Sequence, residues 1–97
     1  MYKQEEILTW AKEKGILDKG NVEAQAEKTL EECMELLEAV KAGDNVEIID
    51  AIGDIYVTIV IQAYMQGRPF KLCVDAAYNV ISKRTGTMVN GMFVKDD

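Results

Sequence analysis

Three acids, Glu47, Asp50 and Asp54, interrupt an otherwise almost wholly apolar segment in the middle of the chain. Their spacing of three and then four residues places all three on one side of a helix. Like charges at this spacing repel one another, and they repel more strongly beside apolar surface, so the folded chain needs a positive partner there. The segment therefore predicts a helix whose acidic stripe binds a divalent cation.

The preceding segment carries a second acidic stripe. Its members are Glu31, Glu32, Glu35 and Glu38, with Lys28 one turn ahead of them. Two acidic helix faces brought together form an oxygen-rich site, which suits Mg²⁺. The chain has no histidine and no paired cysteines that would favour zinc. Mg²⁺ is the predicted cofactor, with Mn²⁺ as a possible substitute.

Four helical patterns separated by glycine-containing breaks fill most of the chain, and they predict helices over about 3–14, 21–42, 45–66 and 70–83. Asn21 is a good N-cap, and Gly15 and Gly43 are good stops. The segment 55–61 is rich in β-branched residues and, taken alone, is typical of a buried strand. Because Gly53 is the one break between 45 and 66, we expect a single long helix there.

After Asp54 this third helix is apolar on nearly all its sides, and a short four-helix chain can hardly enclose it alone. We therefore predict an all-α protomer of four helices that assembles into a homodimer or homotetramer, with residues 1–97 as a single domain. Asn90 and Gly91 stand between two apolar pairs and predict a short hairpin-like C-terminal tail, with a flexible end as the alternative.

Composition limits the classes of partner. The chain has 17 acidic and 11 basic residues and a net charge of -6, so it offers no positive field for a nucleic-acid polymer or an anionic membrane. Residues 1–6 are polar and show no apolar leader. Cys33 and Cys73 lie in predicted helix interiors without metal-ligand spacing, and we expect buried free thiols. These features predict a cytoplasmic protein.

The acidic segments also resemble a known family. Glu31-Glu32-Cys-Met-Glu35, followed by Glu47-Ile-Ile-Asp50-Ala-Ile-Gly-Asp54, is similar to the paired acidic helices of the MazG-like, all-α nucleoside triphosphate pyrophosphohydrolases. The likeness continues through Trp10-Ala-Lys-Glu-Lys-Gly-Ile-Leu and through the ending from Asn79 to Lys95, so it covers nearly the whole chain. One position departs from the family pattern, because Ala51 stands where many members have a glutamate.

The resemblance implies hydrolysis of a (deoxy)nucleoside triphosphate between its α and β phosphates, with Mg²⁺, to give the monophosphate and pyrophosphate. The implied catalytic residues are Glu31, Glu32, Glu35 and Asp54. The implied metal ligands are Glu32, Glu35, Glu47, Asp50 and Asp54, and the fourth ligand is left open between Glu47 and Asp50. A spare acid, Glu31 or Glu47, would accept a proton from the attacking water. The implied substrate-binding residues are Trp10, Lys28, Asn79, Lys83 and Arg84, and the tail would fold over the site as a lid.

Each assignment has a plainer alternative. Lys28 would then pair only with glutamates of its own helix, Lys83 and Arg84 would complement a helix C-terminus, and Trp10 would belong to the core. A different nucleotide, such as phosphoribosyl-ATP or a deoxyuridine or deoxycytidine nucleotide, is an alternative substrate. A helical nucleotide-binding or oligomerisation module without turnover is the alternative from another class.

Overall fold

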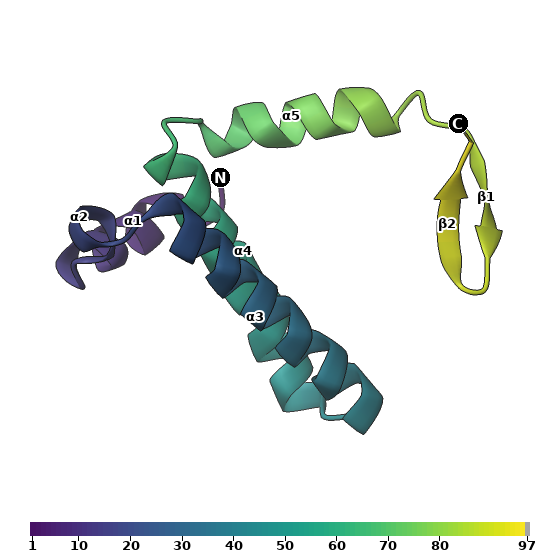
Figure 1. The fold of residues 1–97 in the computed structure, drawn as a ribbon, viewed down its shortest axis with the longest axis horizontal. Helices are drawn as coiled ribbons and strands as arrows, with labels where there is room; N and C mark the ends of the chain where they lie inside the picture. The colour runs from purple at the N-terminus through teal and green to yellow at the C-terminus, as the bar shows by residue number, and fades with distance from the viewer. Residues whose placement is uncertain (97) are drawn as a thin grey trace.

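The computed structural model of the protein describes residues 1–96, and it is mostly helical. Within these residues there are five helices and one two-stranded sheet (Figure 1). The helices are α1 (Gln4–Glu13), α2 (Ile16–Lys19), α3 (Val22–Ala42), α4 (Asn45–Met65) and α5 (Phe70–Ile81), and the strands are β1 (Gly86–Val89) and β2 (Met92–Lys95).

Helices α3 and α4 form an antiparallel pair, packed side by side along their length and joined by a tight turn (Figure 1). The predicted caps fix both ends of this turn and the start of α3. The Asn21 side chain accepts a hydrogen bond from the backbone N–H of Ala24 at 2.8 Å, and that of Asp44 accepts one from Glu47 at 3.2 Å. Gly43 ends α3 in the left-handed conformation, with φ of 67°.

The β-branched segment 55–61 is helical, as predicted, and α4 continues through Gly53 without a break. Its buried residues include Thr58, Val60 and Ile61. The core lies where α1 and the start of α5 meet α4, and the rings of Tyr56 and Phe70 pack edge to face there with centroids 5.6 Å apart. The Tyr56 hydroxyl also donates to the backbone oxygen of Tyr2, which ties the N-terminus to α4.

The predicted count of four helices is wrong by one short element. Residues 16–19 form α2, a single turn that follows Gly15, whose φ is 78°. One turn is too short to show a hydrophobic periodicity, so this helix could not be predicted from the sequence pattern. None of the helices in residues 1–96 combines the length and apolar composition that a membrane crossing requires.

Helix α5 leaves the rest of the fold and ends in the hairpin (Figure 1). Phe70 is its one buried residue, and every residue from 71 to 85 is exposed. The predicted hairpin tail is confirmed: β1 pairs with β2 in antiparallel register, and Asn90 and Gly91 between them both have positive φ, 51° and 81°.

The expectation of buried thiols is wrong in this chain. Cys33 and Cys73 are both exposed and unpaired within residues 1–96, because they lie on sides of α3 and α5 that no other part of the described chain covers.

Candidate functional site

The candidate site begins with a buried carboxylate. Glu32 on α3 is 6 % exposed, and its Oε2 atom is buried without a hydrogen-bond partner. Its other oxygen, Oε1, lies 3.3 Å from the Nζ atom of Lys28, one turn earlier on the same helix. A buried carboxylate oxygen without a hydrogen-bond donor lowers the stability of the fold. A bound cation would offset this cost, and the described chain places no donor next to this atom.

The other acids gather around Glu32 because α3 and α4 run antiparallel. Glu35 lies one turn along α3, and Asp54 faces Glu32 from α4 with Asp50 one turn before it. The neighbouring Glu35 carboxyl lowers the pKa of Glu32, and Glu32 in turn raises the pKa of Glu35. Partial burial raises the pKa of Asp54, and the nearby charges of Asp50 and Glu32 raise it further. We name Glu32, Glu35, Asp50 and Asp54 the acid cluster.

Lys28 is the one basic residue in the described part of the chain that forms an ion pair with an acid of this cluster. It pairs with Glu31 at 3.2 Å as well as with Glu32, and these two contacts raise its pKa. Its head is half exposed, so each pair contributes little to stability. A single lysine therefore leaves most of the negative charge of the cluster without a partner.

As the side chains stand, no three Asp, Glu or Cys residues within positions 1–96 are close enough together to form a metal site. The chemistry of the acid cluster nevertheless fits a divalent cation. All its donors are carboxylate oxygens, and one of them is buried and unpartnered. Burial, together with the charges of Asp50 and Glu32, raises the pKa of Asp54. Glu35 and Asp50 are exposed, so their side chains are free to change rotamer when a cation binds.

Glu47 and Asp50, the two candidates for the fourth metal ligand, lie in different surroundings. Asp50 is near enough to Asp54 to raise its pKa, whereas Glu47 lies at the α3–α4 turn and lines a separate hollow with Glu35, Glu38 and Asp44. Ala51, at the position where many members of the resembled family have a glutamate, is buried on α4 with 2 % exposure. It contributes no carboxylate to the cluster. The geometry favours Asp50 over Glu47.

Two cavities adjoin Asp54, and Trp10 lines both. One, of about 190 Å³, is also lined by Lys28 and Glu32, and the other, of about 330 Å³, by Lys3 and Glu6. Trp10 is 46 % exposed, so it is not a core residue in this chain. The fold thus brings Trp10, Lys28, Glu32 and Asp54 together from α1, α3 and α4.

Sequence reasoning did not single out two polar residues in the smaller cavity. Gln25 and Thr58 line it, and the Gln25 side-chain amide donates to the backbone oxygen of Thr58 at 3.0 Å, which joins α3 to α4. Polar residues on amphipathic helices are common, so neither gave a signal. Two tyrosines of α4 lie outside these cavities: Tyr56 packs on Phe70, and Tyr64 lines a different crevice.

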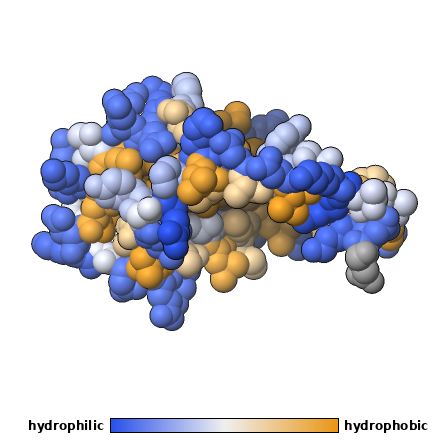
Figure 2. Space-filling view, turned by 90° about the horizontal axis from the view of Figure 1, so that it is seen from above, coloured by the Kyte–Doolittle hydropathy of each residue, from blue (hydrophilic) through white to orange (hydrophobic). Residues whose placement is uncertain are grey.

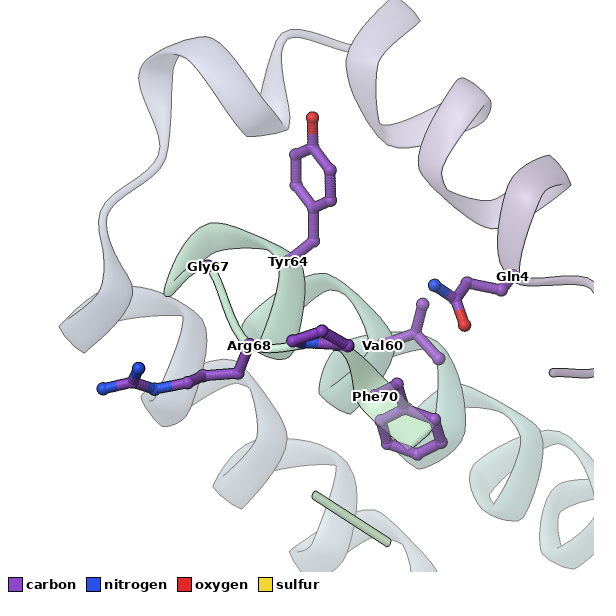
Figure 3. A pocket seen from close by; sticks show the side chains of 7 residues that line it. Gln4, Val60, Tyr64, Gly67, Arg68 and Phe70 are labelled. Atoms are coloured by element: carbon purple, nitrogen blue, oxygen red, sulfur yellow. The ribbon is translucent and has the colours of Figure 1, made fainter. Parts of the chain in front are cut away.

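That crevice, of about 210 Å³, lies where the chain turns from α4 into α5 (Figure 3). Its lining includes Gln4, Val60 and Phe70, and the guanidinium of Arg68 points away from them. It contains no acid and lies away from the acid cluster, so we do not regard it as the functional site.

The remaining predicted substrate residues do not reach the acids in this chain. Asn79 lies in the last part of α5, and Lys83 and Arg84 follow that helix, on the far side of the molecule from the α3–α4 pair (Figure 1). Within residues 1–96 neither basic residue forms an ion pair. The hairpin likewise lies apart from the acids, so it forms no lid over them in the single chain.

Comparison with known proteins places the chain among pyrophosphohydrolases, which are hydrolases acting on acid anhydrides. Searches of curated proteins and of solved structures returned no significant match. The sequence profile described as phosphoribosyl-ATP pyrophosphohydrolase matches residues 8–77, a range that contains the whole acid cluster. This profile and MazG represent the same all-α pyrophosphohydrolase superfamily, so the resemblance is confirmed at that level. Because the match covers well over half of the 97 residues, the chain belongs to the phosphoribosyl-ATP pyrophosphohydrolase family.

Proposed function

We propose that the protein hydrolyses the α–β bond of a nucleotide 5′-triphosphate in the presence of Mg²⁺ and releases pyrophosphate. One observation supports this proposal: Glu32, which has a buried and unpartnered oxygen, lines the same cavity as Asp54 and Trp10. An interaction module without turnover has no evident reason to bury an acid in this way, because the burial costs stability.

Glu32, Glu35 and Asp54 would hold the metal, with Asp50 as the fourth ligand and Glu47 as the alternative. When bound there, Mg²⁺ or Mn²⁺ supplies charge neutralisation for the phosphates and lowers the pKa of a bound water. The acid cluster suits this role because, within residues 1–96, Lys28 alone forms an ion pair with one of its four carboxyl groups.

The chain's own side chains would bind and orient the substrate. Lys28 stands at the edge of the cavity next to Glu32, where its ammonium would bind a phosphate oxygen. Glu31 is exposed and lies beside Lys28, so it would accept the proton of the attacking water, and Glu47 is the alternative acceptor. The indole of Trp10 would stack on the base, because it lines both cavities next to Asp54 and half of it is open.

Two kinds of nucleotide are the candidate substrates. The matched family profile names phosphoribosyl-ATP, which makes it the first candidate. Ordinary (d)NTPs, including dUTP and dCTP, are the second, since they contain the same triphosphate without the additional phosphoribosyl group. The cavities next to Asp54 offer only Lys28 and Lys3 as cations, which favours a substrate with fewer phosphates.

The experiment is a product assay with Mg²⁺ that resolves pyrophosphate from orthophosphate on phosphoribosyl-ATP and a panel of (d)NTPs. Asp54→Asn removes one predicted ligand, and Glu27→Gln is the matched control, because Glu27 is an exposed acid of α3 outside the cluster. We expect pyrophosphate from the wild type and from Glu27→Gln, and at least a 100-fold lower rate from Asp54→Asn. Nucleotide binding without turnover of any substrate would instead indicate a non-catalytic module.

A further inference from the structure

The cavity of about 190 Å³ that contains Glu32 and Asp54 extends along α3, away from the acid cluster. Gln25, Lys28 and Glu32 line it from successive turns of α3, and Gln25 lies about 10 Å from Glu32 along the helix axis. The rest of its lining is uncharged, apart from Asp54, and consists of Trp10, Ile16, Val57, Thr58 and Ile61. The cavity therefore has a charged end at the acids and a largely apolar end at Gln25.

The carboxamide of Gln25 has a fixed orientation at this apolar end. Its Nε2 atom donates to the backbone oxygen of Thr58 at 3.0 Å, and the side chain is partly buried. A backbone carbonyl oxygen can only accept, so the amide nitrogen faces Thr58 and the amide oxygen is turned away from it. Within residues 1–96 the Gln25 side chain forms no other hydrogen bond, so its Oε1 atom and its second N–H are free to bind a ligand.

Gln25 is the one side-chain amide among the residues that line this cavity. Thr58 offers no free donor, because its hydroxyl donates to the backbone oxygen of Ile55 at 2.8 Å. An amide oxygen next to an amide N–H matches the edge of a nucleobase, where an acceptor and a donor also lie side by side. Apolar walls with one correctly placed polar group are typical of a small-molecule pocket.

The other hollows of the described chain lack this combination. Figure 2, seen from the side that carries α5, shows hydrophobic side chains open to solvent across the middle of this face. A groove of about 420 Å³ runs between α4 and α5, with an apolar lining that includes Ile59, Ala63 and Val74, but no acid lines it. The cavity of about 330 Å³ next to Asp54 has no amide or hydroxyl side chain in its lining.

We propose that Gln25 hydrogen-bonds the base of the bound nucleotide and determines which base the protein prefers. The base would occupy the apolar end of the 190 Å³ cavity beside Trp10, with the triphosphate directed toward the acid cluster. About two helical turns separate Gln25 from Glu32, which leaves room for the sugar between them. The proposal rests on the function proposed above, because it takes the ligand to be a nucleotide. Gln25 is a specificity-determining residue, since it lies too far from the acids to touch the reacting phosphate.

Calorimetry in the presence of Mg²⁺ tests this assignment without turnover. The probes are the α,β-methylene analogues of ATP, GTP, CTP and UTP, which cannot be cleaved between the α and β phosphates, and inorganic tripolyphosphate, which has no base. Gln25→Leu removes the amide. Gln62→Leu is the matched control, because the Gln62 amide also joins α4 to α3, through a hydrogen bond of 3.1 Å to the backbone oxygen of Val22, but does not line this cavity.

We expect Gln25→Leu to bind the preferred nucleotide about 10-fold more weakly than the wild type, as for the loss of one good hydrogen-bonded contact to a base. Its preference among the four bases should shrink at the same time. Tripolyphosphate affinity should stay within about 2-fold, because the metal and phosphate end is unchanged. Gln62→Leu should bind every probe as the wild type does. With cleavable nucleotides, Gln25→Leu should raise KM far more than it lowers kcat.

Several outcomes would overturn the assignment. Equal weakening of nucleotide and tripolyphosphate would show that Gln25 only holds the helices together, and an unchanged nucleotide affinity would place the base elsewhere. An effect that disappears with 2′,3′-dideoxy analogues would show that Gln25 contacts the sugar. If circular dichroism shows that Gln25→Leu does not fold, the unbranched Gln25→Met gives the same test. The expected binding pattern without pyrophosphate release from cleavable nucleotides would reject the proposed hydrolysis and keep the base pocket.

Discussion

A pair of neighbouring alanines on α5 offers the sharpest test of the predicted homodimer or homotetramer. Ala77 lines the apolar groove between α4 and α5, whereas Ala76 does not line it and points about 100° away around the helix. Ala77→Asp and Ala76→Asp introduce the same charge, with the same loss of helix propensity, one residue apart. If a second copy covers the groove, only Ala77→Asp places a carboxylate in the interface.

The expected size of the effect follows from burial. Burying a polar group without a hydrogen-bond partner costs about 2 kcal/mol, and burying a charge costs more. A two-fold interface contains the substitution twice, so Ala77→Asp should weaken the dimer by at least about 4 kcal/mol, which is about 1,000-fold in Kd. A dimer of nanomolar affinity would become one of micromolar affinity.

The assay is light scattering coupled to size exclusion over a dilution series, with circular dichroism to verify that both variants keep their helices. We expect Ala76→Asp to behave as the wild type and Ala77→Asp to dissociate at concentrations where the wild type does not. Equal masses for all three proteins at every concentration would refute the inference that this groove is covered by a second copy.

Three further results are expected. Mg²⁺ should raise the melting temperature of the wild type, since it binds the native acid cluster, and should leave that of Asp54→Asn nearly unchanged. Without metal, Asp54→Asn should melt higher than the wild type at neutral pH, because the pKa of Asp54 is raised in the fold and its ionised form is therefore destabilising. This gap should close as the pH falls through the folded-state pKa of Asp54 toward its unfolded value, and a gap independent of pH would contradict the assignment. Gly91→Val should speed hydrogen exchange of the hairpin amides about 5- to 30-fold, because the φ of 81° at this turn costs a β-branched residue about 1–2 kcal/mol, and unchanged exchange would show that the turn adapts.

Local signals made the α3–α4 pair predictable from sequence. Asn21, Gly43 and Asp44 are residues whose side chains or backbone freedom specify helix ends, and all three act as caps in the structure. The strand-like composition of 55–61 did not mislead the prediction, because Gly53 is the only glycine or proline between residues 45 and 66.

The direction of α5 was not predictable in the same way. Gly67 and Pro69 predict a break between two helices but not the angle between them, which depends on how Phe70 meets Tyr56 and Val60. The expected burial of Cys73 failed for this reason. An apolar helix pattern indicates that a side of the helix will be covered, but it does not say whether the same chain covers it.

The acids of the site could be predicted from their spacing alone. Two pairs, Glu32 with Glu35 and Asp50 with Asp54, repeat at helical intervals, and a short turn joins the two helices that carry them. The spacing did not reveal that Glu32 would be the buried member, because burial depends on what α4 presents opposite it. The small Ala51 is buried on α4, between Asp50 and Asp54 in sequence.

Helix α4 links the proposed chemistry to the proposed assembly. Asp54 and Asp50 lie on the part of α4 that meets α3, while Val46, Ile49 and Ile52 extend from the same stretch into solvent. A partner that covers these apolar residues would also exclude water around the acid cluster, and lower local polarity strengthens the attraction between carboxylates and a cation. Dimerisation and Mg²⁺ binding should then favour each other, because each stabilises the arrangement that the other needs. Metal titrations of Ala77→Asp would measure this coupling directly: equal Mg²⁺ affinity in the monomeric variant and the wild-type dimer would show that the acids act independently of the interface.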